Sequence, residues 1–214
     1  MLASNPTKEK KLVKKKKSMN QNSFDQLRLE LSVKAKNGIN FIMAATICWG
    51  IIAFVWMNPG IPTQQALFTF FAVGPMMPLA WAFSKLLKTA WTVENNPLNP
   101  LGLWLNFAQL FYFPFIFIAF NRNPEQMPMA LAIITGAHLF PYAWFYKTKA
   151  YAIMAGVISV GAAIIGCNSG NSGFYVAAFM VVGLVTLVGF LWISLKNNDR
   201  IYKQAVQTEY SEVE

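Results

Sequence analysis

The chain has little charge, little cysteine and one histidine, and each scarcity excludes a class of protein. Charged residues make up 13% of the 214 positions, compared with roughly 25% in an ordinary soluble domain, so too few are present to cover a water-facing surface. The two cysteines, Cys48 and Cys167, have no partners at metal-site spacing, and we interpret both as packing residues. The lone histidine, His138, excludes a histidine-based metal cluster.

Acidic residues are absent from every long apolar segment and occur only in tails and loops. A carboxylate inside a membrane is costly and is usually kept for ion or proton coupling, so this absence disfavours a coupled antiporter. Catalytic patterns are missing too, because the chain has no His-Glu-x-x-His sequence and no glycine-rich phosphate loop between a strand and a helix. We therefore predict no enzyme activity, no cofactor and no bound metal.

What the chain does contain is six apolar segments of about 20 residues, each long enough to cross a hydrocarbon core of about 30 Å. These segments predict an all-α, polytopic membrane protein whose transmembrane domain covers residues 38–195. The loops are too short to hold a soluble domain. The expected spans are residues 38–57, 65–87, 99–120, 127–146, 150–167 and 174–195.

Polar segments flank this domain. Residues 1–22 lack an apolar face and are predicted to be disordered, although Met19 is an alternative start. Residues 23–37 predict a short amphipathic helix at the membrane interface, and residues 196–214 a polar tail. One interpretation of the N-terminal lysine run is contact with anionic lipid, worth about 1 kcal/mol per basic residue; the other is a solvated topology signal. The run consists of Lys14, Lys15, Lys16 and Lys17, without the interleaved aromatics that nucleic-acid binding requires.

The basic residues alternate between loops, and this alternation predicts the orientation. Of 18 Lys and Arg residues, 17 lie before span one or after spans two, four and six, and only Arg122 lies on the other side. By the positive-inside rule, both termini are in the cytoplasm. We expect the protein in a bacterial cytoplasmic membrane.

Prolines interrupt three spans. Each removes a backbone donor and should bend or open its helix, and broken helices at this depth often line cavities in transporters. Kinks that only aid packing are the alternative. The expected kinks are at Pro75, Pro78, Pro114 and Pro141.

A polar seam is predicted between spans three and four. Because a short loop joins these antiparallel spans, residues whose numbers sum to 247 lie at equal depth, which sets Gln109 opposite His138. Asn106 lies on the stripe of Gln109, and Thr135 and Tyr142 lie on the stripe of His138. The seam is either interhelical hydrogen bonding worth about 0.6 kcal/mol per bond, or a small binding pocket or switch that responds to protonation of His138.

Two stretches resemble an uncharacterised family of small six-span bacterial membrane proteins. They are Ala-Lys-Asn-Gly-Ile-Asn-Phe-Ile at residues 35–42, and Gly-Ala-His-Leu-Phe-Pro-Tyr-Ala-Trp-Phe-Tyr-Lys at 136–147, followed by Lys-Ala-Tyr at 149–151. The resemblance covers residues 19–196. It implies topology and bacterial origin but brings no activity.

Two function hypotheses follow. The first is a small-molecule carrier or permease-like protein that uses the polar seam among spans two, three and four. The second is a non-catalytic membrane module, such as an immunity, sensor or assembly subunit, that binds a partner protein. A glycine-bearing surface on span five would serve a homo-oligomer as well as an internal contact.

Overall fold

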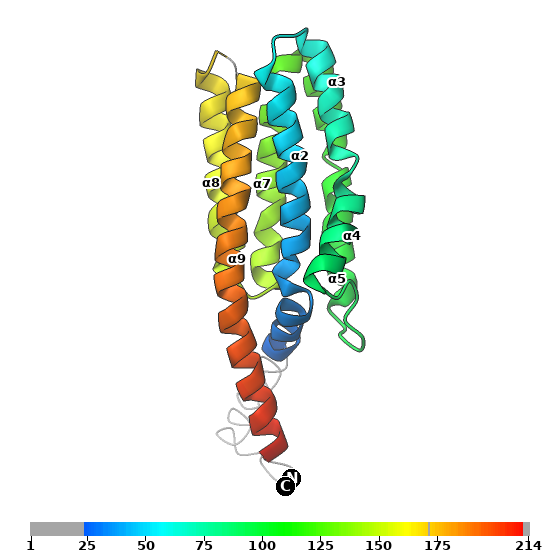
Figure 1. Ribbon diagram of the computed structural model, residues 1–214, viewed down its shortest axis with the longest axis vertical. Coiled ribbons are helices and arrows are strands. Elements are labelled where there is room, and N and C mark those ends of the chain that lie inside the picture. Colours follow the sequence, from blue (N-terminus) through cyan, green and yellow to red (C-terminus); the bar gives the residue numbers. More distant parts are fainter. Residues whose placement is uncertain (1–23, 171, 212–214) are drawn as a thin grey trace, which may run out of the picture.

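A computed structural model describes residues 24–170 and 172–211, and this part of the chain consists of helices joined by short turns (Figure 1). A helix at residues 24–34 comes first. The later elements are η1 (Lys36–Gly38), α2 (Ile39–Met57), α3 (Pro62–Val73), α4 (Met76–Leu87), α5 (Asn99–Leu110), α6 (Phe113–Arg122), η2 (Pro124–Gln126), α7 (Met127–Phe145), α8 (Lys149–Asn168) and α9 (Ser172–Ser211). The tail at residues 1–22, with its four-lysine run, lies outside the described residues.

Six helical stretches in the described part are long and apolar enough to cross a membrane. This confirms the all-α class and the number of candidate spans. The pair α3 and α4 forms the second stretch, and the pair α5 and α6 forms the third. The sixth continues past residue 195, because residues 196–211 contain neither glycine nor proline, and an ion pair between Lys203 and Asp199 (2.7 Å) supports the added turns.

Four helices, α2, α7, α8 and α9, form the core of the molecule. α2 lies along α9 and α7 lies along α8, and α9 also contacts α7 and α8 (Figure 1). Ile52 on α2, Ile158 on α8 and Leu187 on α9 are completely buried. In lipid, such helices associate through close packing more than through a hydrophobic driving force.

The remaining helices, α3 to α6, form an outer pair of divided spans beside this core (Figure 1). They bury far less: α5 has no buried residue, and α6 has only Ile116. Large apolar side chains such as Phe111, which is 84% exposed, face outward from the pair. The protein therefore combines a packed four-helix core with an outer pair that buries few residues, of which span two lies along α2 and span three has the fewest buried residues.

Close approach between α7 and α8 depends on Gly136. A Cβ atom built on this glycine would lie 2.5 Å from the Ser159 hydroxyl oxygen and 2.9 Å from the Ser159 backbone nitrogen. The backbone atom cannot move aside as a flexible side chain could. The glycines of span five behave differently from one another: a Cβ on Gly161 would meet Phe179 of α9, whereas one on Gly156 would meet nothing within 4 Å.

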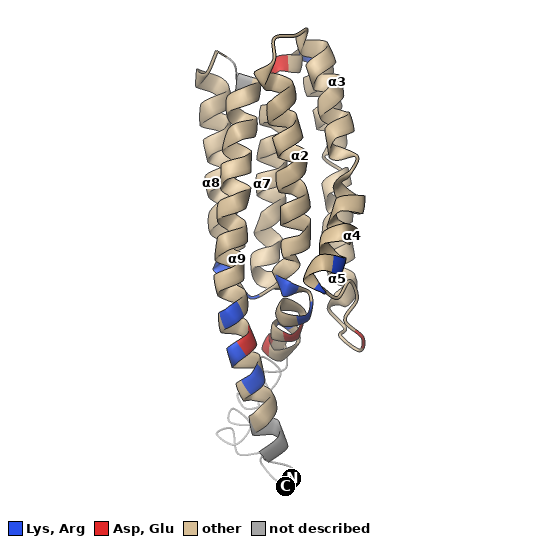
Figure 2. Cartoon of the chain, viewed as in Figure 1, with Lys and Arg blue, Asp and Glu red and all other residues tan. Residues whose placement is uncertain are grey.

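Basic residues gather at one end of the bundle, which we call the basic end (Figure 2). It is the end at which α2, α5 and α8 begin and α4 and α7 finish. The helix at residues 24–34 docks against it and buries Leu29 and Leu31. Its Arg28 donates to the Trp144 carbonyl at the end of α7 (2.6 Å) and lies over the Trp144 ring. The helix that was predicted to lie at the membrane interface therefore packs against the basic end of the protein.

A buried polar cluster, Ser32, Asn37 and Asn198, joins this helix to the core. Ser32 donates to the Asn37 side-chain oxygen (2.6 Å), and the Asn198 amide donates to Ser32 (2.8 Å). Asn37 has a positive φ of 55°, a conformation that asparagine tolerates better than most residues. Its carbonyl accepts a hydrogen bond from Tyr151 (2.6 Å), and its amide donates to the Leu191 carbonyl (3.1 Å). Residues far apart in the chain are therefore fixed together at the basic end.

Replacing Gly136 with alanine is expected to destabilise the protein by about 1–3 kcal/mol, because the added methyl overpacks a contact that includes backbone. The measurement is thermal unfolding of the purified protein in detergent. Gly156→Ala is the matched control on the partner helix, and it should leave the melting temperature unchanged or slightly higher. Equal losses in the two variants would contradict the assigned close approach.

Candidate functional site

The second span is divided near its middle, between α3 and α4. Gly74 follows α3, and its N–H donates to the Phe71 carbonyl (3.1 Å), three residues back. An α-helix would direct this N–H to the Phe70 carbonyl, and the next residue, Pro75, has no N–H to offer. The Phe70 carbonyl therefore loses its α-helical donor. Pro78 lies in the first turn of α4, where a missing N–H costs no helical hydrogen bond.

The third span is divided in the same way, between α5 and α6. Phe111 and Tyr112 separate the two helices, and their N–H groups donate three residues back, to the carbonyls of Ala108 and Gln109. Pro114 lies in the first turn of α6. By contrast, Pro141 lies inside α7, which continues past it to Phe145. Two of the three proline-bearing spans are thus broken into separate helices.

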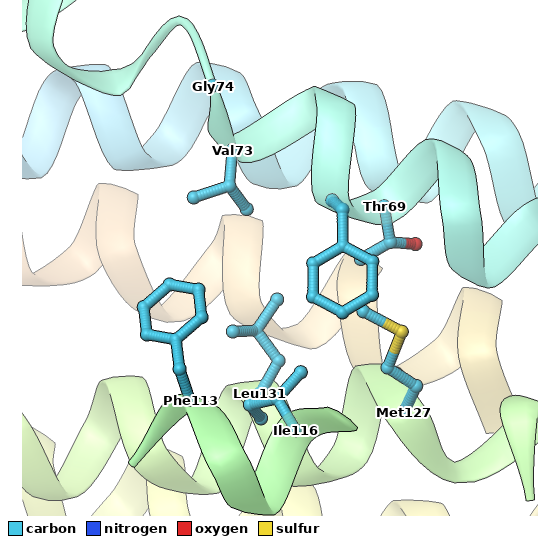
Figure 3. Close-up of a pocket in the computed structure, with 8 residues that line it drawn as sticks. Thr69, Val73, Gly74, Phe113, Ile116, Met127 and Leu131 are labelled. Atoms are coloured by element: carbon cyan, nitrogen blue, oxygen red, sulfur yellow. The ribbon is translucent and has the colours of Figure 1, made fainter. Parts of the chain in front are cut away.

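A cavity of about 230 Å³ lies where these divided spans meet the core, and we call it the break cavity. Figure 3 shows side chains of α3 directed toward those of α6 and α7 across it. Ile116, the one buried residue of α6, and Leu131 of α7 have numbers that sum to 247, the relation predicted for equal depth. The lining consists of Thr69, Phe70, Val73, Gly74, Phe113, Ile116, Met127 and Leu131.

The lining is apolar except for Thr69, whose hydroxyl is already engaged. It donates to the Gln65 carbonyl (2.9 Å) and accepts from the Trp56 indole nitrogen (3.0 Å). Beside the cavity, the ring of Phe70 stacks on Phe117 at 5.3 Å. The site offers shape and apolar surface, and it has no charged side chain with which to perform acid–base or nucleophilic chemistry.

The predicted seam residues are only partly brought together. His138 and Tyr142 on α7 are joined by a 3.4 Å hydrogen bond between Nε2 and the phenol oxygen. Asn106 instead donates to the Gly102 carbonyl of its own helix (3.0 Å). Within residues 24–170 and 172–211, no hydrogen bond joins Gln109 to His138. Thr135 lies one turn before His138, partly exposed, and none of the five lines the break cavity.

The equal-depth relation itself holds at the basic end, where a Cβ on Gly102 would lie 3.0 Å from the Phe145 ring. The seam therefore has the predicted register without the predicted hydrogen bonds. The cause is geometric, since an asparagine or histidine reaches a group one turn away on its own helix more easily than one on a loosely packed neighbour. The functional role of the seam stays a prediction.

Sequence reasoning missed the lining of the break cavity and the Ser32–Asn37–Asn198 cluster. The prolines at positions 75 and 114 marked the depth of the breaks, but apolar lining residues look the same as any lipid-facing residue. Among the described residues, no group of three or more His, Cys, Asp or Glu side chains is arranged to hold a metal ion.

Fold and composition define the class, a multi-pass membrane protein with six helices able to cross a bilayer. Residues 24–195 match the DUF7010 family, a family of unknown function, and the chain belongs to this family. The match confirms the resemblance to an uncharacterised membrane protein family. The matched residues extend from the docked N-terminal helix to residue 195, within α9. No curated protein and no solved structure matches the chain.

Proposed function

We propose that this protein is a small-molecule carrier whose substrate site is the break cavity. The observation that carries the proposal is the position of the cavity, which adjoins the break in span two and the start of α6 just after the break in span three. Discontinuous helices around a site near mid-membrane are a recurring feature of transporters. Such breaks also provide the points at which one part of a protein can move relative to another.

The moving part in this proposal is the outer pair, α3 to α6. Few residues of the pair are buried. Span two is nevertheless joined to α2 by hydrogen bonds from Asn40 to the Ala80 carbonyl (3.3 Å) and from Trp56 to Thr69 (3.0 Å), so a movement of the pair has to exchange these bonds. The core is held by close helix contacts and, at its basic end, by the Ser32–Asn37–Asn198 cluster. This difference supports rocking of the outer pair against a fixed core.

Replacing Pro75 with alanine is expected to slow transport, because the new N–H can reconnect α3 and α4 and stiffen the break. The measurement is solute uptake into proteoliposomes that contain the purified protein. Pro100→Ala is the matched control, since Pro100 lies in the first turn of α5, where proline breaks no helical hydrogen bond. A carrier is contradicted if the wild-type protein moves no solute, and a role of the break in transport is contradicted if both variants keep full rates.

His138→Leu decides in the same assay whether the seam takes part. Loss of uptake with an unchanged melting temperature would assign His138 a role in transport. Unchanged uptake would leave the His138–Tyr142 bond as a packing contact.

The second candidate function, a partner-binding membrane module, is favoured by the exposed surface of α5. Trp104 on this helix is 68% exposed, and no residue of α5 is buried. A stoichiometric partner that copurifies with the protein, without any uptake in proteoliposomes, would support this function over the carrier.

We also propose that the basic end faces the cytoplasm of a bacterial cell, because the positive-inside rule places loop lysines there (Figure 2). Gly170 and Lys149 are exposed at opposite ends of α8. In a chain whose Cys48 and Cys167 are changed to alanine, Gly170→Cys should react with an impermeant maleimide in intact cells. Lys149→Cys should react only after permeabilisation, and the reverse pattern would overturn the orientation.

A further inference from the structure

We propose that the break cavity is a binding site for a small, uncharged, apolar molecule about the size of one aromatic ring. The inference rests on the proposed carrier function, because it names the class of substrate that the same site takes. It is argued from the volume, the lining and the position of the cavity.

The volume suits a single ring. An apolar protein cavity of about 150 Å³ stays free of water and binds benzene. The break cavity measures about 230 Å³ and is partly open, so it has room for a ring with a short substituent. A drug-sized or lipid-sized molecule needs a larger site, since ligand pockets for such molecules measure about 300–1,000 Å³.

The lining excludes charge. An ion that entered the cavity would lose its hydration and meet no side chain of opposite charge. Burying such an unpaired charge costs much free energy. Thr69 uses its only hydroxyl donor on the Gln65 carbonyl. Thr69 is the one polar side chain of the lining, whereas a water molecule in a cavity needs two to four polar partners, so the side chains of the site favour an apolar occupant.

The position of the cavity gives such a molecule a route. Met127 on the core side is completely buried, while the outer wall comes from α3 and α6, which are mostly exposed. Ile116 is the one buried residue of α6. An apolar molecule dissolved in the bilayer therefore reaches the site by displacing part of the outer pair and leaves the core in place.

The test is thermal unfolding of the purified full chain in detergent, with benzene as the probe and benzoate as the charged comparison. Val73→Phe fills the cavity from α3, and Val160→Phe makes the same change at a position on α8 that is 59% exposed. Benzene at about ten times its half-saturating concentration should raise the melting temperature of the wild type and Val160→Phe by roughly 3–6 °C. Val73→Phe should show no rise, and benzoate should raise none of the three.

Three outcomes would overturn the site: no benzene response in the wild type, an equal response in Val73→Phe, or an equal response to benzoate. Should Val73→Phe fail to fold, Ile116→Phe fills the cavity from α6 and carries the same expectation. The test requires no flux, so the two proposals fail separately. Benzene binding without uptake of any solute would contradict the carrier function and support the binding site. Uptake that Val73→Phe leaves unchanged would support a carrier and contradict the break cavity as its substrate site.

Discussion

Backbone N–H and C=O groups need hydrogen-bond partners in hydrocarbon, and this requirement organises the protein. A continuous helix satisfies its backbone groups with its own hydrogen bonds, as α2, α8 and most of α7 and α9 do. Two spans do not, because Pro75 and Pro114 remove donors in mid-span. At the breaks, the N–H groups of Gly74, Phe111 and Tyr112 donate to carbonyls three residues back, and a new helix begins after each break.

The division into core and outer pair coincides with these breaks, since the two outer spans are the divided ones. A straight helix can present one long face to its neighbour, as α7 does to α8 through Gly136. Both halves of span two lie along α2, and both halves of span three contact α7. The break cavity lies beside the breaks, between the last turn of α3, the first turns of α6 and the N-terminal half of α7. The basic end shows the opposite solution, since Ser32, Asn37 and Asn198 satisfy one another where the chain leaves the spans.

Much of this arrangement could be predicted from sequence, and the reasons differ by feature. The six spans follow from apolar length alone, and the breaks from the positions of proline. The register of spans three and four followed from their short loop, as Gly102 against Phe145 illustrates. The polar bonds across that register could not be predicted, because Asn106 and His138 found partners on their own helices. Asn37 and Asn198 look like solvated residues in a sequence, but in the fold both are buried, Asn37 against Tyr151 and Leu191 and Asn198 against Ser32 and the Tyr146 carbonyl.

The central claim is that spans two and three are mechanically divided, whereas the core is continuous. Amide hydrogen exchange of the protein in lipid nanodiscs tests it most directly, because exchange reports local opening of backbone hydrogen bonds. The account predicts early exchange in residues 70–78 and 108–114, and late exchange in residues 150–166 of α8. Equal protection in all three segments would contradict a divided outer pair, and with it the carrier and ligand proposals that depend on the breaks.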